Sequence, residues 1–212
     1  AKSELNVSFI GAGNYAKRKL IPSFKKHGSS FLDIVSNNGL NSFLVGNKYN
    51  FEYASTELDL LFKNKKSNII VIASRHDSHA EYIIKGLKSG KHIFVEKPLC
   101  LSMNQLQEIK NEYTGKNLLM IGYNRRFAPA IQKLKNFLDK SKVPKAFNYT
   151  CNAGFISKDH WVNDKSVGGG RLIGEACHFV DLLRFLTDSQ INKIQVNYLN
   201  DNNNIGDTFT IQ

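Results

Sequence analysis

Two features that many proteins carry are missing from this 212-residue sequence: a long apolar segment and a cysteine framework. No run of about 18 apolar residues is present that could span a bilayer, and no basic-then-apolar leader stands at the start. The three cysteines, Cys100, Cys151 and Cys177, lie far apart and form no CxxC pair. We therefore expect no association with a membrane, and free thiols in a reducing cytoplasm.

Acidic residues are also scarce, since 18 Asp and Glu stand against 29 Lys and Arg, for a net charge of +11. Such an excess attracts anions, including phosphates and nucleic acids. The basic residues are spread along the chain, however, and the pattern of aromatic and basic residues typical of RNA-binding domains is missing. We therefore expect no nucleic-acid partner. The 42% apolar content predicts a substantial core in one domain or two small ones.

Short apolar runs alternate with helical patterns over residues 1–123. The runs predicted to be strands are residues 7–10, 31–35, 51–54, 68–74, 92–96 and 117–123. Strands that alternate with helices of this length indicate βαβ units, so we predict an α/β fold with a doubly wound parallel sheet, a Rossmann domain.

Details of three helices follow from single residues. Pro22 should kink or split the first helix, because proline lacks an N–H group. Ser78 is predicted to cap the helix whose apolar positions are Ala80, Ile83, Ile84 and Leu87. The helix over residues 102–113 is expected to bury Met103, Leu106 and Tyr113.

From about residue 124 the pattern changes. A helix over 129–138 is followed by strand-like residues 145–154, a polar loop, a helix through 178–186 and strand-like residues 193–199. The last residues, DTFTIQ, look like the middle of a strand. We predict that residues 124–212 begin an α+β domain, with too few strands to close a sheet, and that the sequence is part of a longer chain.

The turn GAGNYA follows the first strand. Gly11 permits a tight turn, Gly13 lets the backbone approach a pyrophosphate, and Ala16 takes the place of a third glycine. The helix that follows offers N–H groups to the phosphates. The turn therefore predicts a dinucleotide site that includes Asn14 and Tyr15.

The end of the second strand should read the ribose of that dinucleotide. An acid there holds the 2'-hydroxyl of NAD, whereas a basic or small polar environment admits the phosphate of NADP. Ser36 and Asn37 occupy this position, and Asp33 lies earlier in the strand and is expected to point elsewhere. The cofactor is therefore predicted to be NAD or NADP, without a choice between them.

The stretch IASRHDSHAEYIIKGLKSGKHIFVEKPL resembles the Gfo/Idh/MocA oxidoreductases, and the resemblance continues through GYNRRFAP and GGGRLIGEACHFVD. It covers the chain from Val7 to about Leu186. The form GEACHFVDLLRFL, with KDHWVND before it, is most similar to a module of bi-domain oxidoreductases linked to polysaccharide or nucleotide-sugar metabolism. There it follows a zinc-alcohol-dehydrogenase-like domain, which would be fused in front of this chain. The resemblance also implies that residues 124–212 begin a substrate and oligomerisation domain, and that the complete protein is a homo-oligomer.

The resemblance implies hydride transfer between a nicotinamide cofactor and a sugar or nucleotide-sugar hydroxyl or ketone. Lys97 is then the leading acid or base, because it ends a parallel strand where α/β sheets bind ligands. Glu96 would support the cofactor or orient the lysine, and we predict a cis bond between Lys97 and Pro98. The alternative is a solvated lysine at a strand end.

His178 and Glu175 are predicted to assist Lys97. His178 begins a helix and can bind the substrate hydroxyl or act as a base, with Asp181 or Glu175 fixing its tautomer. The family's usual acid lies four residues before the histidine, where this chain has Gly174, so Glu175 is its expected replacement. A histidine with a purely structural role at a domain junction is the alternative.

The remaining candidates flank these groups. Ser74, Arg75 and His79 belong to a loop that runs beside the cofactor in the family, and Arg75 either contacts an anion or lies on the surface. Arg126 either braces the domain junction or touches substrate, and Trp161 either lies under a sugar ring or anchors packing.

No metal is expected, because the histidines lack ligand spacing with a Cys or acid partner. The functional alternative from another class is a non-catalytic sensor or partner module that binds the cofactor without turnover.

Overall fold

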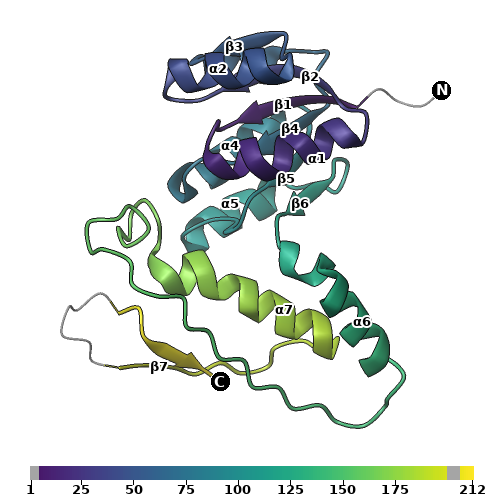
Figure 1. Cartoon of the computed structure of the whole chain (residues 1–212), viewed down its shortest axis with the longest axis vertical. Helices are drawn as coiled ribbons and strands as arrows, with labels where there is room; N and C mark the ends of the chain where they lie inside the picture. Colours follow the sequence, from purple (N-terminus) through teal and green to yellow (C-terminus); the bar gives the residue numbers. More distant parts are fainter. Residues whose placement is uncertain (1–4, 200–205) are drawn as a thin grey trace. The chain divides into compact units, whose positions relative to one another are not determined.

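The structure is a computed structural model that describes residues 5–199 and 206–212, and the chain divides into two compact units, Ala1–Gly122 and Tyr123–Gln212 (Figure 1). The first unit contains a six-stranded sheet in the order β3-β2-β1-β4-β5-β6. Its strands are β1 (Asn6–Ile10), β2 (Ser30–Val35), β3 (Tyr53–Ser55), β4 (Ile69–Ile72), β5 (His92–Val95) and β6 (Leu119–Ile121). All neighbouring strands are parallel, which confirms the predicted doubly wound sheet.

Helices cover both faces of this sheet. They are η1 (Ala16–Leu20), α1 (Ile21–Lys26), α2 (Gly39–Tyr49), α3 (Leu58–Lys63), η2 (His76–Ser78), α4 (His79–Lys88) and α5 (Met103–Glu112). The core residues of η1, α1 and α2 pack with Phe9 and Ile34, whereas those of α3, α4 and α5 pack with Ile10 and Val35. Successive strand residues therefore serve opposite faces, as the pleat requires.

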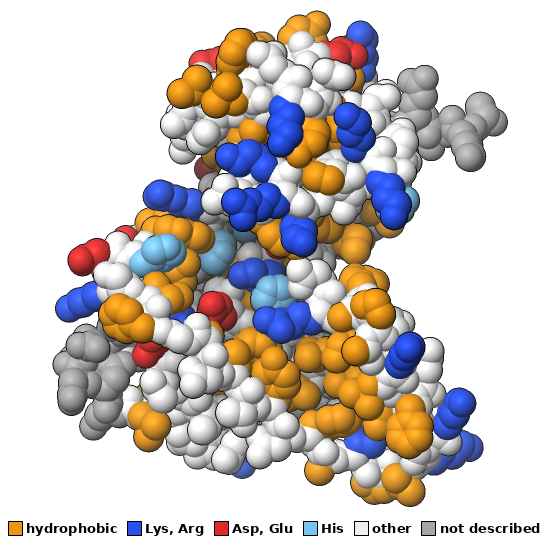
Figure 2. Space-filling model, in the orientation of Figure 1, with side chains coloured by type: hydrophobic (Ala, Val, Ile, Leu, Met, Phe, Trp, Pro, Cys, Tyr) orange, Lys and Arg blue, Asp and Glu red, His pale blue; other side chains and the backbone are white. Residues whose placement is uncertain are grey.

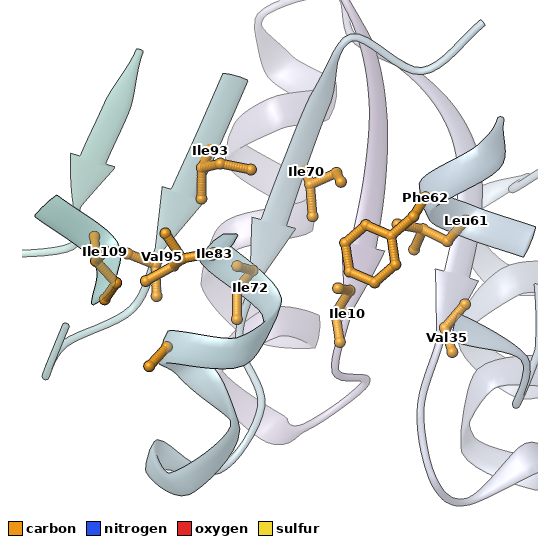
Figure 3. Packing of buried hydrophobic residues seen from close by; sticks show 11 residues of the cluster. Ile10, Val35, Leu61, Phe62, Ile70, Ile72, Ile83, Ile93, Val95 and Ile109 are labelled. Atoms are coloured by element: carbon orange, nitrogen blue, oxygen red, sulfur yellow. The ribbon is translucent and has the colours of Figure 1, made fainter. Parts of the chain in front are cut away.

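The cluster beneath α3, α4 and α5 is made almost entirely of branched aliphatic side chains (Figure 3). Ile70, Ile72, Ile83 and Ile93 are completely or almost completely buried in it. Strands that are covered on both faces need such continuous apolar runs. The cluster includes Ile72 and Val95, the last residues of β4 and β5, and so holds the carboxyl ends of these strands in place.

The structure also tests the single-residue predictions about helices. The first helix is split as expected, into the π-helical turn η1 and then α1, which has Pro22 in its first turn. Ser78 stands at the N-cap position of α4, as predicted, but its side chain makes no capping hydrogen bond. Its hydroxyl instead donates to the carbonyl of Arg75, since a 3₁₀ turn precedes α4.

The predicted buried face of α5 is also wrong in part. Met103 is 77% exposed and Tyr113 is 42% exposed, and Leu106 is half-buried. Ile109 is the buried residue of this helix. Met103 is the first residue of α5. At a helix terminus, a residue can have the spacing of the buried face and still have no neighbouring element to cover it.

The second unit has helices η3 (Asn124–Phe127), α6 (Pro129–Leu138), η4 (Leu172–Ala176) and α7 (Cys177–Thr187), and an antiparallel pair, β7 (Val196–Tyr198) and β8 (Phe209–Ile211). Residues 145–154 are not a strand, which corrects the prediction. Their sequence suits a strand, but within the described part of the chain no neighbouring backbone pairs with them.

None of the helices in residues 5–199 and 206–212 is long and apolar enough to cross a membrane. All three cysteines are free thiols, as predicted.

Candidate functional site

A row of residues closes the carboxyl edge of the parallel sheet. Each continues the backbone ladder one step past its strand: Gly11 N–H donates to Val35, Ala73 to Ile10, Glu96 to Ile72 and Gly122 to Val95, at 2.7–2.9 Å. The strand order reverses between β1 and β4, and open α/β sheets bind ligands at such a reversal, outside the carboxyl ends of the strands. This edge is therefore the candidate cofactor site of the first unit.

The two glycines of the turn after β1 differ in what they leave open. Gly11 has φ +106°, and a Cβ on it would lie 2.4 Å from the carbonyl oxygen of Ala73, so only glycine fits there. A Cβ on Gly13 would meet no atom within 4 Å, so the face of this residue is open space next to the start of η1. Asn14 and Tyr15 are exposed in the same turn. This arrangement suits a backbone that a pyrophosphate approaches closely.

The end of β2 carries no carboxylate toward this edge. The Ser36 hydroxyl donates to the carbonyl of Asn38 at 2.9 Å and lies 2.7 Å from the Ser42 hydroxyl, so it holds the turn into α2. Asn37 is exposed beside it. Asp33 is buried and accepts from the Ser8 hydroxyl at 2.6 Å, which confirms that it points elsewhere.

Glu96 and Lys97 follow β5, between β4 and β6 at this edge, and the bond between Lys97 and Pro98 is cis, as predicted. Both side chains are half-buried. Burial raises the pKa of the Glu96 carboxyl to about 7, although the charge of Lys97 and a hydrogen bond from its backbone act in the opposite direction. The edge thus holds a carboxyl group that changes its charge in the neutral range.

His79 braces two of the loops at this edge. Its ring is completely buried, with Nδ1 2.7 Å from the carbonyl oxygen of Pro98 and Nε2 3.2 Å from that of Ser74. Both contacts favour the protonated ring, but burial outweighs them and lowers the pKa of His79. Because the ring does not reach the surface, its contribution to a cofactor site is to position Ser74 and Pro98. Arg75, in the same loop, is exposed.

In the second unit, Arg126 and Asp181 form an ion pair. The Arg126 guanidinium donates two hydrogen bonds to the Asp181 carboxylate and also packs over the Phe185 ring. His178, one helical turn before Asp181, packs edge-on against the Tyr123 ring. Asp181 and Arg126 thus hold η3 against α7, within one unit.

Glu175 is bonded to a buried arginine. Arg171 donates to Glu175 at 2.9 Å, to the Gly154 carbonyl at 2.7 Å and to Asp207 at 3.4 Å. These residues line a cavity of about 700 Å³ together with Phe179. The Arg171 guanidinium thus engages one oxygen of the Glu175 carboxylate.

Trp161 lies in a loop on which the GGG turn folds back. A Cβ on Gly168 would lie 2.4–2.5 Å from backbone atoms of Trp161 and Val162, and Gly170 donates to the Val162 carbonyl at 2.9 Å. The triple glycine therefore serves close backbone packing, and Trp161 is half-buried beside it.

Sequence reasoning did not single out two residues that shape these sites, Gly122 and Arg171. Gly122 lies against Glu96, since a Cβ on it would be 2.8 Å from the Glu96 Oε1 atom. The signal for Gly122 was present, as a glycine directly after an apolar run. Arg171 had no such signal, because only the fold brings Asp207 and Gly154 to it.

Basic side chains are spread over the face of the first unit that carries η1 and α1 (Figure 2). Among residues 5–199 and 206–212, no group of three or more His, Cys, Asp or Glu side chains could hold a metal ion.

Comparison with known proteins agrees with this geometry. Residues 5–123 match the model of the GFO_IDH_MocA family, described as an oxidoreductase family with an NAD-binding Rossmann fold. This match confirms the resemblance drawn from the motifs, and with it NAD or NADP as the type of cofactor.

Individual relatives are distant and longer. The chain is 27% identical over 203 residues to oxidoreductase cns1 of Cordyceps militaris, covering 93% of this chain and 26% of that protein. It is 29% identical over 128 residues to scyllo-inositol 2-dehydrogenase (NAD(+)) of Bacillus subtilis, covering 59% of this chain and 36% of the relative.

Among solved structures, levoglucosan dehydrogenase in complex with NADH and levoglucosan superimposes with a TM-score of 0.79 and 21% identity, covering 93% of this chain and 57% of that one. At this identity the likeness establishes the fold. The chain spans well under two thirds of the length of each of these proteins.

The two glycines of the turn give a paired prediction. Gly13→Val fills open space, so we expect the unfolding free energy to stay within about 0.5 kcal/mol while cofactor binding weakens at least tenfold. Gly11→Ala forces a methyl group onto the Ala73 carbonyl, so stability itself should fall by more than about 1 kcal/mol. Urea unfolding and calorimetric titration with NAD and NADP measure both. Equal effects of the two changes would contradict the distinction.

A second prediction concerns pH. The folded pKa of Glu96, about 7, lies above its ordinary value of 4.5, so the folded state favours the protonated form. The wild-type chain should therefore lose stability relative to Glu96→Gln as the pH rises from about 4.5 to 7, and the difference should be constant above about pH 8. After discounting for partial exposure, we expect about 1–2 kcal/mol. Urea unfolding of both proteins at several pH values measures it, and parallel curves would contradict it.

Proposed function

Because the chain belongs to the Gfo/Idh/MocA oxidoreductase family, with its NAD-binding Rossmann fold, we propose that the complete protein transfers hydride between a nicotinamide cofactor and a hydroxyl or ketone carbon of a sugar or nucleotide sugar. The observation that carries the proposal is the position of Lys97, one residue beyond the sheet edge that also holds Gly11. The inositol and levoglucosan dehydrogenases among the relatives support a sugar-like substrate.

Oxidation of an alcohol releases a proton and a hydride. The bound nicotinamide accepts the hydride in one direction and supplies it in the other. Lys97 is the group that we assign to the proton: its amine takes the hydroxyl proton during oxidation and returns it during reduction. Burial raises the pKa of Glu96, beside it, to about 7, so a change in the charge of Glu96 alters the field around the lysine.

We assign His178 and Glu175 to the substrate as assisting groups. His178 can hydrogen-bond the reacting hydroxyl, and Glu175 replaces the acid that the family has one residue earlier. We give Glu175 the smaller part, since Arg171 already engages its carboxylate. Asp181 and Arg126 are assigned a positioning role: their charges are paired with each other, and the pair holds α7 in place. The residues from Tyr123 onward would then be the beginning of a substrate and oligomerisation domain.

Two features concern the setting of the protein. Free cysteines favour a reducing compartment, so we place it in the cytoplasm. We propose a homo-oligomer for the complete protein, with a further dehydrogenase-like domain ahead of this chain.

Replacing Lys97 tests the proposal. In Lys97→Ala we expect kcat with the best substrate of a sugar and nucleotide-sugar panel to fall about 10²- to 10⁴-fold, because proton transfer loses its positioned group. Cofactor affinity should stay within about threefold, and Lys88→Ala, an exposed lysine on α4, should behave as wild type. Nicotinamide absorbance in the complete protein measures turnover.

Two results would count against the enzyme. If the complete protein binds cofactor but turns over no member of the panel, the alternative of a non-catalytic sensor or partner module holds. If Lys97→Ala keeps the wild-type rate, the proton is handled by another group.

The end of β2 gives a further prediction for the cofactor. Asn37→Asp introduces a carboxylate where none faces the ribose, which should bind the 2'-hydroxyl of NAD and repel the phosphate of NADP. We expect the ratio of the dissociation constants for NADP and NAD to rise about tenfold or more, as measured by calorimetric titration. Asn41→Asp, further along α2, is the control. An unchanged ratio would place the ribose elsewhere.

A further inference from the structure

Glu96 and Gly122 are neighbours across two parallel strands. Val95 pairs with Ile121, so the next residues along, Glu96 and Gly122, stand side by side, and the Gly122 N–H donates to the Val95 carbonyl at 2.7 Å. Side chains of neighbouring residues in a parallel pair project from the same face of the sheet. A side chain at position 122 would therefore lie alongside that of Glu96.

The Glu96 carboxyl occupies the place that such a side chain would fill. A Cβ on Gly122 would lie 2.8 Å from Oε1, 3.0 Å from Cδ and 3.1 Å from Oε2 of Glu96. The first distance is shorter than real Cβ atoms show and the other two are tighter than most real Cβ contacts, so the carboxyl group lies directly against the glycine. Gly122 has no left-handed backbone that would itself require glycine. Glycine is therefore required at this position by the space that the Glu96 carboxyl takes, and not by the backbone conformation.

The Glu96 carboxyl group is also largely withdrawn from water, and this burial is the main cause of its raised pKa. Of the neighbours at the same edge, Ala73 on the β4 side and Gly122 on the β6 side carry no charge. Lys97 is the charged group that acts on Glu96 within the described part of the chain, and its effect is smaller than that of burial. Burial lowers the pKa of His79, from α4, and so disfavours a positive charge on its ring.

We propose that Gly122 is a positioning residue of the cofactor site: it seats the Glu96 carboxyl on the end of β6, where proton binding switches its charge and with it the preference of the site for the oxidised, positively charged nicotinamide over the reduced one. The coupling to nicotinamide rests on the proposed function. The seating of Glu96 does not.

The first experiment needs no cofactor. The carboxyl carbon of Glu96 is followed by NMR in the ¹³C-glutamate-labelled chain, with its signal assigned from its loss in Glu96→Gln. We expect a midpoint near 7 in the wild type and a fall toward 4.5 in Gly122→Ala, because the new methyl group displaces the carboxyl into water. Glu96→Asp, which is one methylene shorter and is followed in the ¹³C-aspartate-labelled chain, should have a midpoint closer to the ordinary value of its carboxyl group and serves if Gly122→Ala does not fold. Equal midpoints in all variants would overturn the role of Gly122.

The second experiment measures dissociation constants for the oxidised and reduced forms of NAD and NADP at about pH 5.5 and about pH 8. In the wild type, the preference for the oxidised form should grow about three- to tenfold between the two pH values, as Glu96 ionises. It should be nearly constant in Gly122→Ala, where Glu96 is ionised at both, and in Glu96→Gln. In the double variant, Gly122→Ala should add nothing to Glu96→Gln.

The outcomes separate the two claims. A wild-type preference that does not change with pH, in a chain that binds cofactor, overturns the coupling to nicotinamide. A chain that binds neither cofactor form at either pH overturns the proposed function together with the coupling, while the NMR titration still decides the role of Gly122.

Discussion

The candidate site depends on the extension of the backbone ladder by one step beyond each strand. Gly11, Ala73, Glu96 and Gly122 all donate to the neighbouring strand, so the edge is as rigid as the sheet itself. Loops that start from such an edge begin at fixed positions, which is what a binding site requires. Two of the four positions are glycines, because at these points a backbone or a carboxyl group takes the space of a side chain.

Away from the candidate site, the charges of Asp33 and Lys91 are satisfied by internal hydrogen bonds. Asp33 accepts from Ser8 and Asn64, and the Lys91 ammonium donates to the carbonyls of Asn64 and Ser67 at 2.5–2.6 Å. Buried charges persist only when they are bonded in this way. The acid of β2 is thereby fixed at the amino end of the strands, and the ribose end is left with neutral polar groups.

Predictions from the sequence succeeded where a single local pattern decides the structure. Alternating apolar runs and glycine turns were enough to give the parallel sheet, the close turn at Gly11 and the position of Lys97. They failed where a distant neighbour decides. Residues 145–154 have the composition of a strand but no pairing partner among the described residues, and Met103 has the spacing of a core residue but no covering element. Strand pairing and burial are properties of two segments, and one segment does not contain them.

The sequence by itself determined the family, the Rossmann sheet and the type of cofactor, because these follow from motifs whose residues lie close together in the chain. Only the tertiary structure decided which charges are already paired, as Arg171 with Glu175, and which carboxyl group is stripped of water. Glu96 could be read from the sequence as a site residue. Its raised pKa could not, because that results from burial in the folded chain, where the carboxyl group lies against Gly122 one strand away.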